Sequence, residues 1–220
     1  TYLNTGGGTY VAWNWKVNGG STSSNTNGSL TSTVQVDPSG HLSIGLYTAN
    51  ATNSTIGHGL SATPSLIIIK KRDNQARNWV VWARGTGSAT QGYLNLNSNT
   101  YGTDSQIWQN TAPTSTVFSV NYGTTETNAA SGDAFVFYAF ANCAGYIKSG
   151  YYTGNADTDG PFVYTGFRPA WLMVKYVASG ESWVIVDNKR DGYNPTSKNT
   201  RANDDVEETS GSTYYVDLLS

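Results

Sequence analysis

The most suggestive group of possible ligands in this sequence is a run of oxygen-bearing side chains at alternating positions. Asn155, Asp157 and Asp159 are each separated by one residue, and Gly160 follows them. Oxygen ligands at alternating positions ahead of a glycine are typical of the opening of a calcium-binding loop. The bidentate glutamate that normally closes such a loop is absent, because position 166 is glycine. Ordinary Asx turns produce the same pattern, so a weak calcium site and a plain turn stay open as alternatives.

The histidines and the cysteine do not indicate a metal centre or a catalytic nucleophile. His41 and His58 are the only histidines, and neither has a second ligand at the spacing of a metal site. His58 lies in a turn, and its counterpart in the internal repeat described below is Thr165. We therefore expect a structural role for His58. The single cysteine, Cys143, excludes an internal disulfide and a cysteine-based zinc site.

The acidic residues do not indicate a glycosidase. Hydrolysis of a glycosidic bond requires two carboxylates that converge on the sugar. Here Glu126, Glu181 and the acidic run at residues 204–208 all fall in predicted loops or strand ends, and the run is typical of a solvated turn. No Gly-x-Ser-x-Gly and no phosphate-loop pattern is present. The sequence therefore predicts a protein that is not an enzyme.

The aromatic residues suggest a sugar-binding role, because flat rings stack on pyranose faces. The chain contains 15 tyrosines and 7 tryptophans, most of them on predicted strands where packing in a core is expected. Four tyrosines lie in or beside predicted loops and are the candidate glycan contacts: Tyr101, Tyr122, Tyr151 and Tyr193.

The composition predicts an all-β protein. Charged residues make up 13% of the 220 residues, and Gly, Ser, Thr and Asn are abundant, which favours short strands joined by polar turns over long helices. The formal net charge is −2 and no basic run occurs, so nucleic acid is not an expected partner. No apolar stretch is long enough to cross a membrane.

The predicted strands, which would position the candidate residues, belong to an internal repeat. The segment containing Tyr47 and Lys70 recurs about 105 residues later around Tyr152 and Lys175, and Trp79 recurs as Trp183. A duplicated framework is more typical of a scaffold than of a single active site. Strands are expected at residues 9–16, 30–36, 41–48, 66–71, 78–83, 92–96, 116–120 and 133–140.

The repeat predicts two tandem β-sandwich-like units with antiparallel strands and little or no helix. The first covers residues 1–130, with a long polar loop at 18–29, and the second covers residues 131–220. Residues 133–140 are expected to open the second unit, because their pattern resembles that of residues 9–16. The second unit has no counterpart of the strand at 116–120, so we expect residues beyond position 220 or a neighbouring subunit to supply the missing strand.

Long runs of the chain resemble a family of bacteriophage virion proteins. The resemblance lies in Tyr-Val-Ala-Trp-Asn-Trp-Lys-Val-Asn-Gly-Gly (10–20), Gly-Ser-Leu-Thr-Ser-Thr-Val-Gln-Val (28–36), Gly-His-Gly-Leu (57–60) and the run at 159–175 that begins Asp-Gly-Pro-Phe-Val-Tyr-Thr-Gly-Phe-Arg-Pro. Members occur in phages of marine and freshwater bacteria, cyanophages among them. They are described as tail fibre or structural proteins.

The resemblance implies a virion protein that attaches to a host or assembles with itself, and it carries over no catalytic residues. The expected partners are further copies of the chain, with a trimer favoured by analogy, other virion proteins and a host surface glycan. One alternative is a filament or capsid-decoration subunit that assembles by strand donation. A second alternative is a carbohydrate-binding lectin or a glycosidase.

Overall fold

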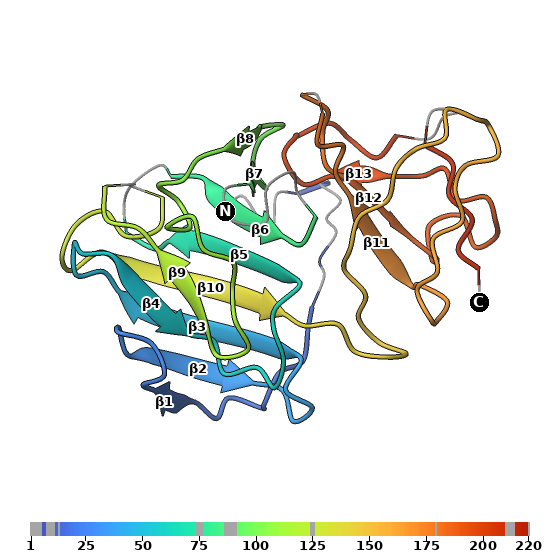
Figure 1. Ribbon diagram of the computed structural model, residues 1–220. Coiled ribbons are helices and arrows are strands. Elements are labelled where there is room, and N and C mark those ends of the chain that lie inside the picture. The colour runs from blue at the N-terminus through green and yellow to red at the C-terminus, as the bar shows by residue number, and fades with distance from the viewer. Residues whose placement is uncertain are drawn as a thin grey trace.

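The computed structural model describes residues 6–7, 12, 14–73, 77–85, 92–123, 126–178, 180–209 and 214–219 (Figure 1). All regular secondary structure in these ranges is antiparallel β-sheet, and no residue in them is helical. The predicted all-β fold class is therefore confirmed. Accordingly, the same ranges contain no long apolar helix of the kind that crosses a membrane.

The strands form one large sheet and two small ones. The large sheet has eight strands in the order β1 (Ser23–Asn25), β2 (Ser32–Val36), β3 (Leu42–Thr48), β10 (Ala134–Phe140), β5 (Leu66–Lys71), β6 (Trp79–Ala83), β7 (Gly92–Asn95) and β8 (Tyr101–Thr103). A two-stranded sheet pairs β4 (Ser54–Gly57) with β9 (Val117–Val120). A three-stranded sheet contains β11 (Trp171–Val174), β12 (Val184–Asp187) and β13 (Thr200–Arg201).

The main core lies between one face of the large sheet and the β4–β9 pair. Tyr47 of β3 stacks on Phe135 of β10 with 5.0 Å between ring centroids, and Phe137 packs edge-on against Phe118 of β9 at 5.2 Å. The Tyr47 hydroxyl donates a hydrogen bond of 2.6 Å to the carbonyl oxygen of Thr127. Alternating apolar residues on β3, β5 and β10 thus turn one face of the sheet toward β9, as the two-residue period of a strand requires.

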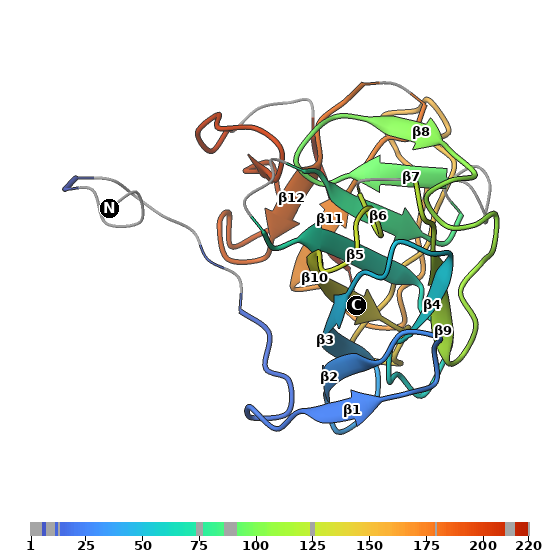
Figure 2. The same ribbon diagram turned by 90° about the vertical axis from the view of Figure 1, so that its left-hand side faces the viewer.

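The opposite face of the large sheet is covered by the three-stranded sheet. Trp183 and Met173 pack there against Ile68, Val81 and Leu94, which point away from the main core. Figure 2 shows the arrangement nearly edge-on, with β4 and β9 on one side of the large sheet and β11 and β12 on the other. The strands are therefore organised as three layers around two cores.

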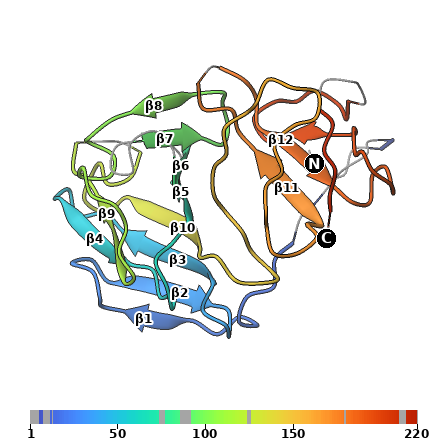
Figure 3. The same ribbon diagram turned by 45° about the vertical axis from the view of Figure 1, so that its right-hand side comes forward.

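The position of β10 differs from the predicted division of the chain at residue 131. We expected residues 133–140 to open the second unit, but β10 lies in the centre of the large sheet between β3 and β5. Phe137 pairs with Gly45 on one side and with Ile69 on the other. The sheet of the first unit thus extends to Phe140, and the connection that follows runs along the molecule to β11 (Figure 3).

The repeat is reproduced in the register of the strands. Ile68 of β5 pairs with Val81 of β6, and their counterparts Met173 and Ile185 pair in the same way in β11 and β12. The register continues into the third strand, because β7 and β13 pair with equivalent residues of β6 and β12. Three strands of the repeat are therefore built alike.

Two expectations at the N-terminal end have different outcomes. The strand expected at residues 9–16 lies partly outside the described residues, and those that are described there, 12 and 14–16, are not in a regular strand. The polar loop expected at 18–29 contains the short edge strand β1, which pairs with β2. Backbone hydrogen bonds suffice for an exposed edge strand, so apolar residues are not needed there.

Candidate ligand-binding surface

The residues of the candidate calcium loop form a series of Asx turns. The Asn155 side-chain oxygen accepts a hydrogen bond from the Asp157 amide at 3.2 Å, and Asp157 Oδ1 accepts one from the Asp159 amide at 3.0 Å. The Asn155 side-chain nitrogen donates to the Asp159 carbonyl oxygen at 2.9 Å. Two of the oxygens proposed as ligands therefore already stabilise the turn. In the described ranges, this loop included, there is no group of three or more His, Cys, Asp or Glu side chains that could hold a metal ion.

His58 is fully buried and has hydrogen bonds at both ring nitrogens. Nδ1 accepts from the Leu60 amide at 3.1 Å, and Nε2 lies 3.3 Å from the Thr114 carbonyl oxygen. This assigns a neutral ring with the proton on Nε2. Burial lowers the pKa of the imidazole, and the Thr114 carbonyl offsets this only in part. These contacts agree with the expected structural role. His41, by contrast, belongs to a surface turn organised by Asp37.

We expect the buried His58 to make the fold sensitive to acid. Because its pKa is lower in the folded state than the ordinary value of about 6.5, the unfolded chain binds an extra proton as the pH falls below that value. The free energy of unfolding should then decrease by up to about 1.4 kcal/mol per pH unit from this residue. Urea unfolding between pH 7 and 5 measures the slope. A His58→Gln variant with an equally steep slope would contradict this assignment.

The acidic residues take part in structural ion pairs and turns. Arg190, whose side chain is 9% exposed, contacts Asp187 at 2.8 Å and Glu208 at 2.6 Å. Burial raises the pKa of Asp187, but hydrogen bonds from Arg190 and from the Lys189 amide outweigh it and the net shift is downward. Arg201 contacts Asp204 at 3.1 Å. The run at 204–208 is thus tied to the β12–β13 region by two arginines.

The four candidate tyrosines come from four separate segments. Tyr101 is half-buried on β8 and lines a pocket. Tyr122, Tyr151 and Tyr193 are highly exposed, at 54%, 74% and 73%. The Tyr151 ring lies directly against the backbone of Gly85, because a Cβ added there would come within 1.9 Å of it. Tyr101 therefore differs from the three highly exposed tyrosines in being half-buried beside a pocket.

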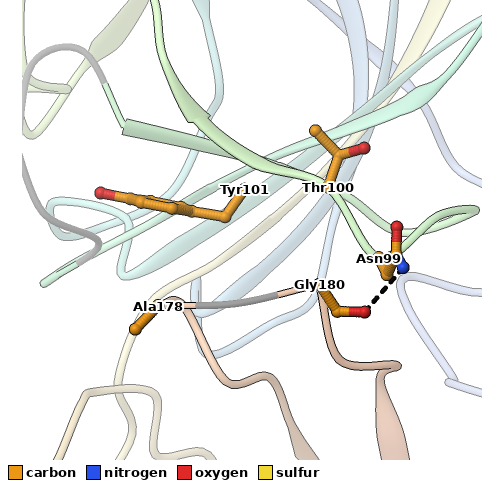
Figure 4. A pocket seen from close by; sticks show the side chains of 5 residues that line it. All are labelled: Asn99, Thr100, Tyr101, Ala178 and Gly180. Carbon is orange, nitrogen blue, oxygen red and sulfur yellow. Dashed lines mark hydrogen bonds between the residues drawn. The ribbon is translucent and has the colours of Figure 1, made fainter.

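The pocket beside Tyr101 lies where the large sheet meets the loop that precedes β12. It has a volume of about 250 Å³ and is lined by Asn99, Thr100, Tyr101, Ala178 and Gly180. The Asn99 side-chain nitrogen donates a 2.6 Å hydrogen bond to the Gly180 carbonyl oxygen and joins the two walls. Figure 4 shows the Tyr101 ring above the loop that carries Ala178. This volume lies just below the range of roughly 300–1,000 Å³ that is usual for ligand pockets, so the pocket would hold no more than one small ring.

Sequence reasoning identified Tyr101 but missed the residues around it. Gly180 is some eighty positions from Asn99, and the two meet because the three-stranded sheet packs on the large one. Close by, the Trp183 indole donates a buried 2.8 Å hydrogen bond to the Asn95 carbonyl oxygen. The repeat gives no signal for such contacts, since it describes each unit and not their packing.

Comparison with known proteins gives one family match. A family model described as Domain of unknown function (DUF7483) matches residues 1–220. No curated protein and no solved structure matches the chain. That description names no ligand, so a function has to be argued from the surface itself.

Proposed function

The chain belongs to the family described as Domain of unknown function (DUF7483), and on that premise we propose that it is a non-enzymatic structural protein of a bacteriophage virion, used as a tail-fibre or adhesin module. The virion location is supported by the resemblance of residues 10–20 and 159–175 to phage structural proteins. The contact with a host glycan is supported by the distribution of aromatic side chains.

The observation that carries the adhesin role is the concentration of exposed aromatic rings in the last third of the chain. Of the ten exposed aromatic side chains among the described residues, eight lie beyond residue 140. Exposed aromatic surface marks sites of interaction, and such rings bind sugars through their faces while keeping polar tips in water. The eight are Tyr146, Tyr151, Tyr152, Phe162, Tyr164, Tyr176, Tyr193 and Tyr215.

The pocket beside Tyr101 is the proposed point of glycan contact. A sugar ring needs one flat apolar face and several hydrogen-bonding groups around its edge. Tyr101 offers the face, while the Asn99 side-chain oxygen, which takes no part in the bond to Gly180, offers a hydrogen-bond acceptor.

The partners follow from the same proposal. Further copies of the chain, with a trimer favoured by analogy, and other virion proteins would hold the module in a fibre. Calcium at Asn155, Asp157 and Asp159 stays a prediction of the sequence, with no role in the proposed contact. Among the described residues no strand pairs with the second edge of β11, and this supports a second candidate, a filament or capsid-decoration subunit held by strand pairing between copies.

Substitution in the pocket tests the glycan contact. On a glycan array, the wild-type protein should bind a defined set of glycans, and Asn99→Ala and Tyr101→Ala should each weaken that binding about tenfold or more, since roughly 1.4 kcal/mol is lost with a hydrogen bond or a ring face. Tyr122→Ala is the matched control, because Tyr122 is an exposed tyrosine that does not line the pocket. Its binding should be unchanged.

Two outcomes would contradict the proposal. If the pocket variants keep their unfolding temperature and bind glycans as well as the wild type, the pocket is not the contact. If the purified protein degrades a polysaccharide, and a preparation of an unrelated protein from the same host does not, the non-enzymatic assignment is wrong.

A further inference from the structure

The three-stranded sheet has an open edge at a position where the large sheet is paired. In the large sheet, β5 lies between β6 and β10. Its counterpart β11 pairs with β12 on one side, and within the described part of the chain no strand pairs with it on the other. An edge of this kind exposes backbone donors and acceptors that readily bind a further strand.

The register of the large sheet shows which residues of β11 point their backbone N–H and C=O groups to this open edge. The Arg72 amide donates to the Ala134 carbonyl oxygen at the end of β10, at 2.7 Å. Backbone groups alternate between the two neighbours along a strand, so Ile68, four positions earlier, also faces β10. Its counterpart is Met173, which therefore presents its backbone groups to the open edge of β11. The same holds for Trp171, the counterpart of Leu66.

Two side chains of the second copy of the repeat are relevant to whether a strand equivalent to β10 lies beside β11. The indole nitrogen of Trp171 is buried and has no hydrogen-bond partner among the described residues, although a buried donor is normally paired. Tyr152 is the counterpart of Tyr47, which is 3% exposed and stacked on β10, yet Tyr152 is 53% exposed. Among the regular strands of the described residues, none equivalent to β10 covers these two side chains.

The chain contains a second segment with the pattern of β10. Residues 9–16 resemble residues 133–140 at an offset of 125, with Trp15 in the place of Phe140. In the large sheet, Phe140 pairs with Leu66, whose counterpart is Trp171. The repeat therefore predicts that Trp15 lies opposite Trp171. The two rings are in contact, with centroids 6.0 Å apart and planes at 88°.

We propose that the segment of the same chain that carries Trp15, which in the structure contacts β11 through the Trp171 ring without regular strand hydrogen bonds, pairs antiparallel with β11 in the register that places Trp15 opposite Trp171 and takes the place that β10 has beside β5. Two independent facts lead to the same pair of residues, namely the register of the large sheet and the Trp15–Trp171 contact. The contact lies within one chain, which favours this donor over the same segment of a second copy.

Amide hydrogen exchange on the full chain tests the pairing. The Trp171 and Met173 amides should exchange at least tenfold more slowly in the wild type than in Trp15→Asp, which removes the aromatic contact and adds a charge. Trp15→Phe should keep the protection. Tyr193→Ala, at an exposed ring outside the segment, should leave it unchanged. Equal exchange of these two amides in the wild type and in Trp15→Asp would overturn the proposal.

A disulfide test identifies the donor. Residues directly opposite in an antiparallel pair have Cα atoms about 4.5–5.5 Å apart, within the range of a disulfide. With Cys143 replaced by serine, the Trp15→Cys/Trp171→Cys protein should form an intramolecular disulfide and stay monomeric on a denaturing gel. Trp15→Cys/Tyr193→Cys is the control and should not form it. A disulfide-linked dimer, or no disulfide at all, would overturn the assignment to the same chain.

Discussion

Replacement of Gly45 by alanine should lower the free energy of unfolding by roughly 2 kcal/mol or more, because the new methyl group has no room. Gly45 lies on β3 directly opposite Phe137 of β10, and a Cβ at this position would come within 2.1 Å of the Phe137 ring. That ring is held between Phe118 and Tyr47, at centroid distances of 5.2 and 6.5 Å, so it cannot move without disturbing the main core. The close contact outweighs the roughly 0.5–1 kcal/mol that alanine gains over glycine in a strand.

Gly150 provides a matched control within the same molecule. It occupies the position of Gly45 in the second copy of the repeat, but a Cβ there would meet no atom of the described residues within 4 Å. Gly150→Ala should therefore change the free energy of unfolding by no more than about 0.5 kcal/mol. Urea unfolding of both variants measures the difference. If the two substitutions have the same effect, the packing of Gly45 against Phe137 is wrong.

This pair of glycines illustrates what the sequence could predict. The repeat identifies Gly45 and Gly150 as equivalent, and it places the strands that became β3, β5 and β6 with useful accuracy. The repeat does not predict that Phe137 lies opposite Gly45, whereas the space beside Gly150 is open. That difference depends on β10, which comes from about ninety residues further along the chain.

The placement of β10 failed to follow from sequence for a physical reason. Apolar alternation determines which side chains of a strand face a core, but not which strands become its neighbours. Residues 133–140 resemble residues 9–16, and that likeness suggested the start of a new unit. In the structure the same alternation fits between β3 and β5, where both neighbours contribute apolar residues to the main core. Pairing between distant segments decided the topology.

The candidate site was predictable to a similar extent. Tyr101 was found because it lies beside a loop, and it does line a pocket. The opposite wall, with Ala178 and Gly180, depends on how the three-stranded sheet packs on the large one, and local composition holds no information about that. The calcium loop shows the converse, since Asn155 and Asp157 have the spacing of ligands but use their oxygens in turns.

The packing of the three-stranded sheet depends strongly on Trp183, and Trp183→Ala should lower the free energy of unfolding by about 3–5 kcal/mol. Trp183 is 4% exposed and packs in the second core against residues of the large sheet. Its indole nitrogen donates a buried 2.8 Å hydrogen bond to the Asn95 carbonyl oxygen. Truncation to alanine leaves a cavity and removes the shorter of the two hydrogen bonds that this oxygen accepts, the other being a 3.4 Å bond from the Ser98 amide.

The three-stranded sheet should then unfold before the rest of the molecule. It has three short strands, and a sheet of this size depends on packing against another layer for stability. In Trp183→Ala we expect a second, lower transition by calorimetry and faster amide exchange in β12 than in β3. Trp183→Phe keeps most of the apolar contact but loses the hydrogen bond, so a smaller loss of roughly 1–3 kcal/mol is expected. Removal of a buried side chain of this size from a tight interface should lower the free energy of unfolding by much more than about 1 kcal/mol. If Trp183→Ala unfolds in a single cooperative transition and loses less than about 1 kcal/mol of its free energy of unfolding, this tryptophan does not hold the layers together.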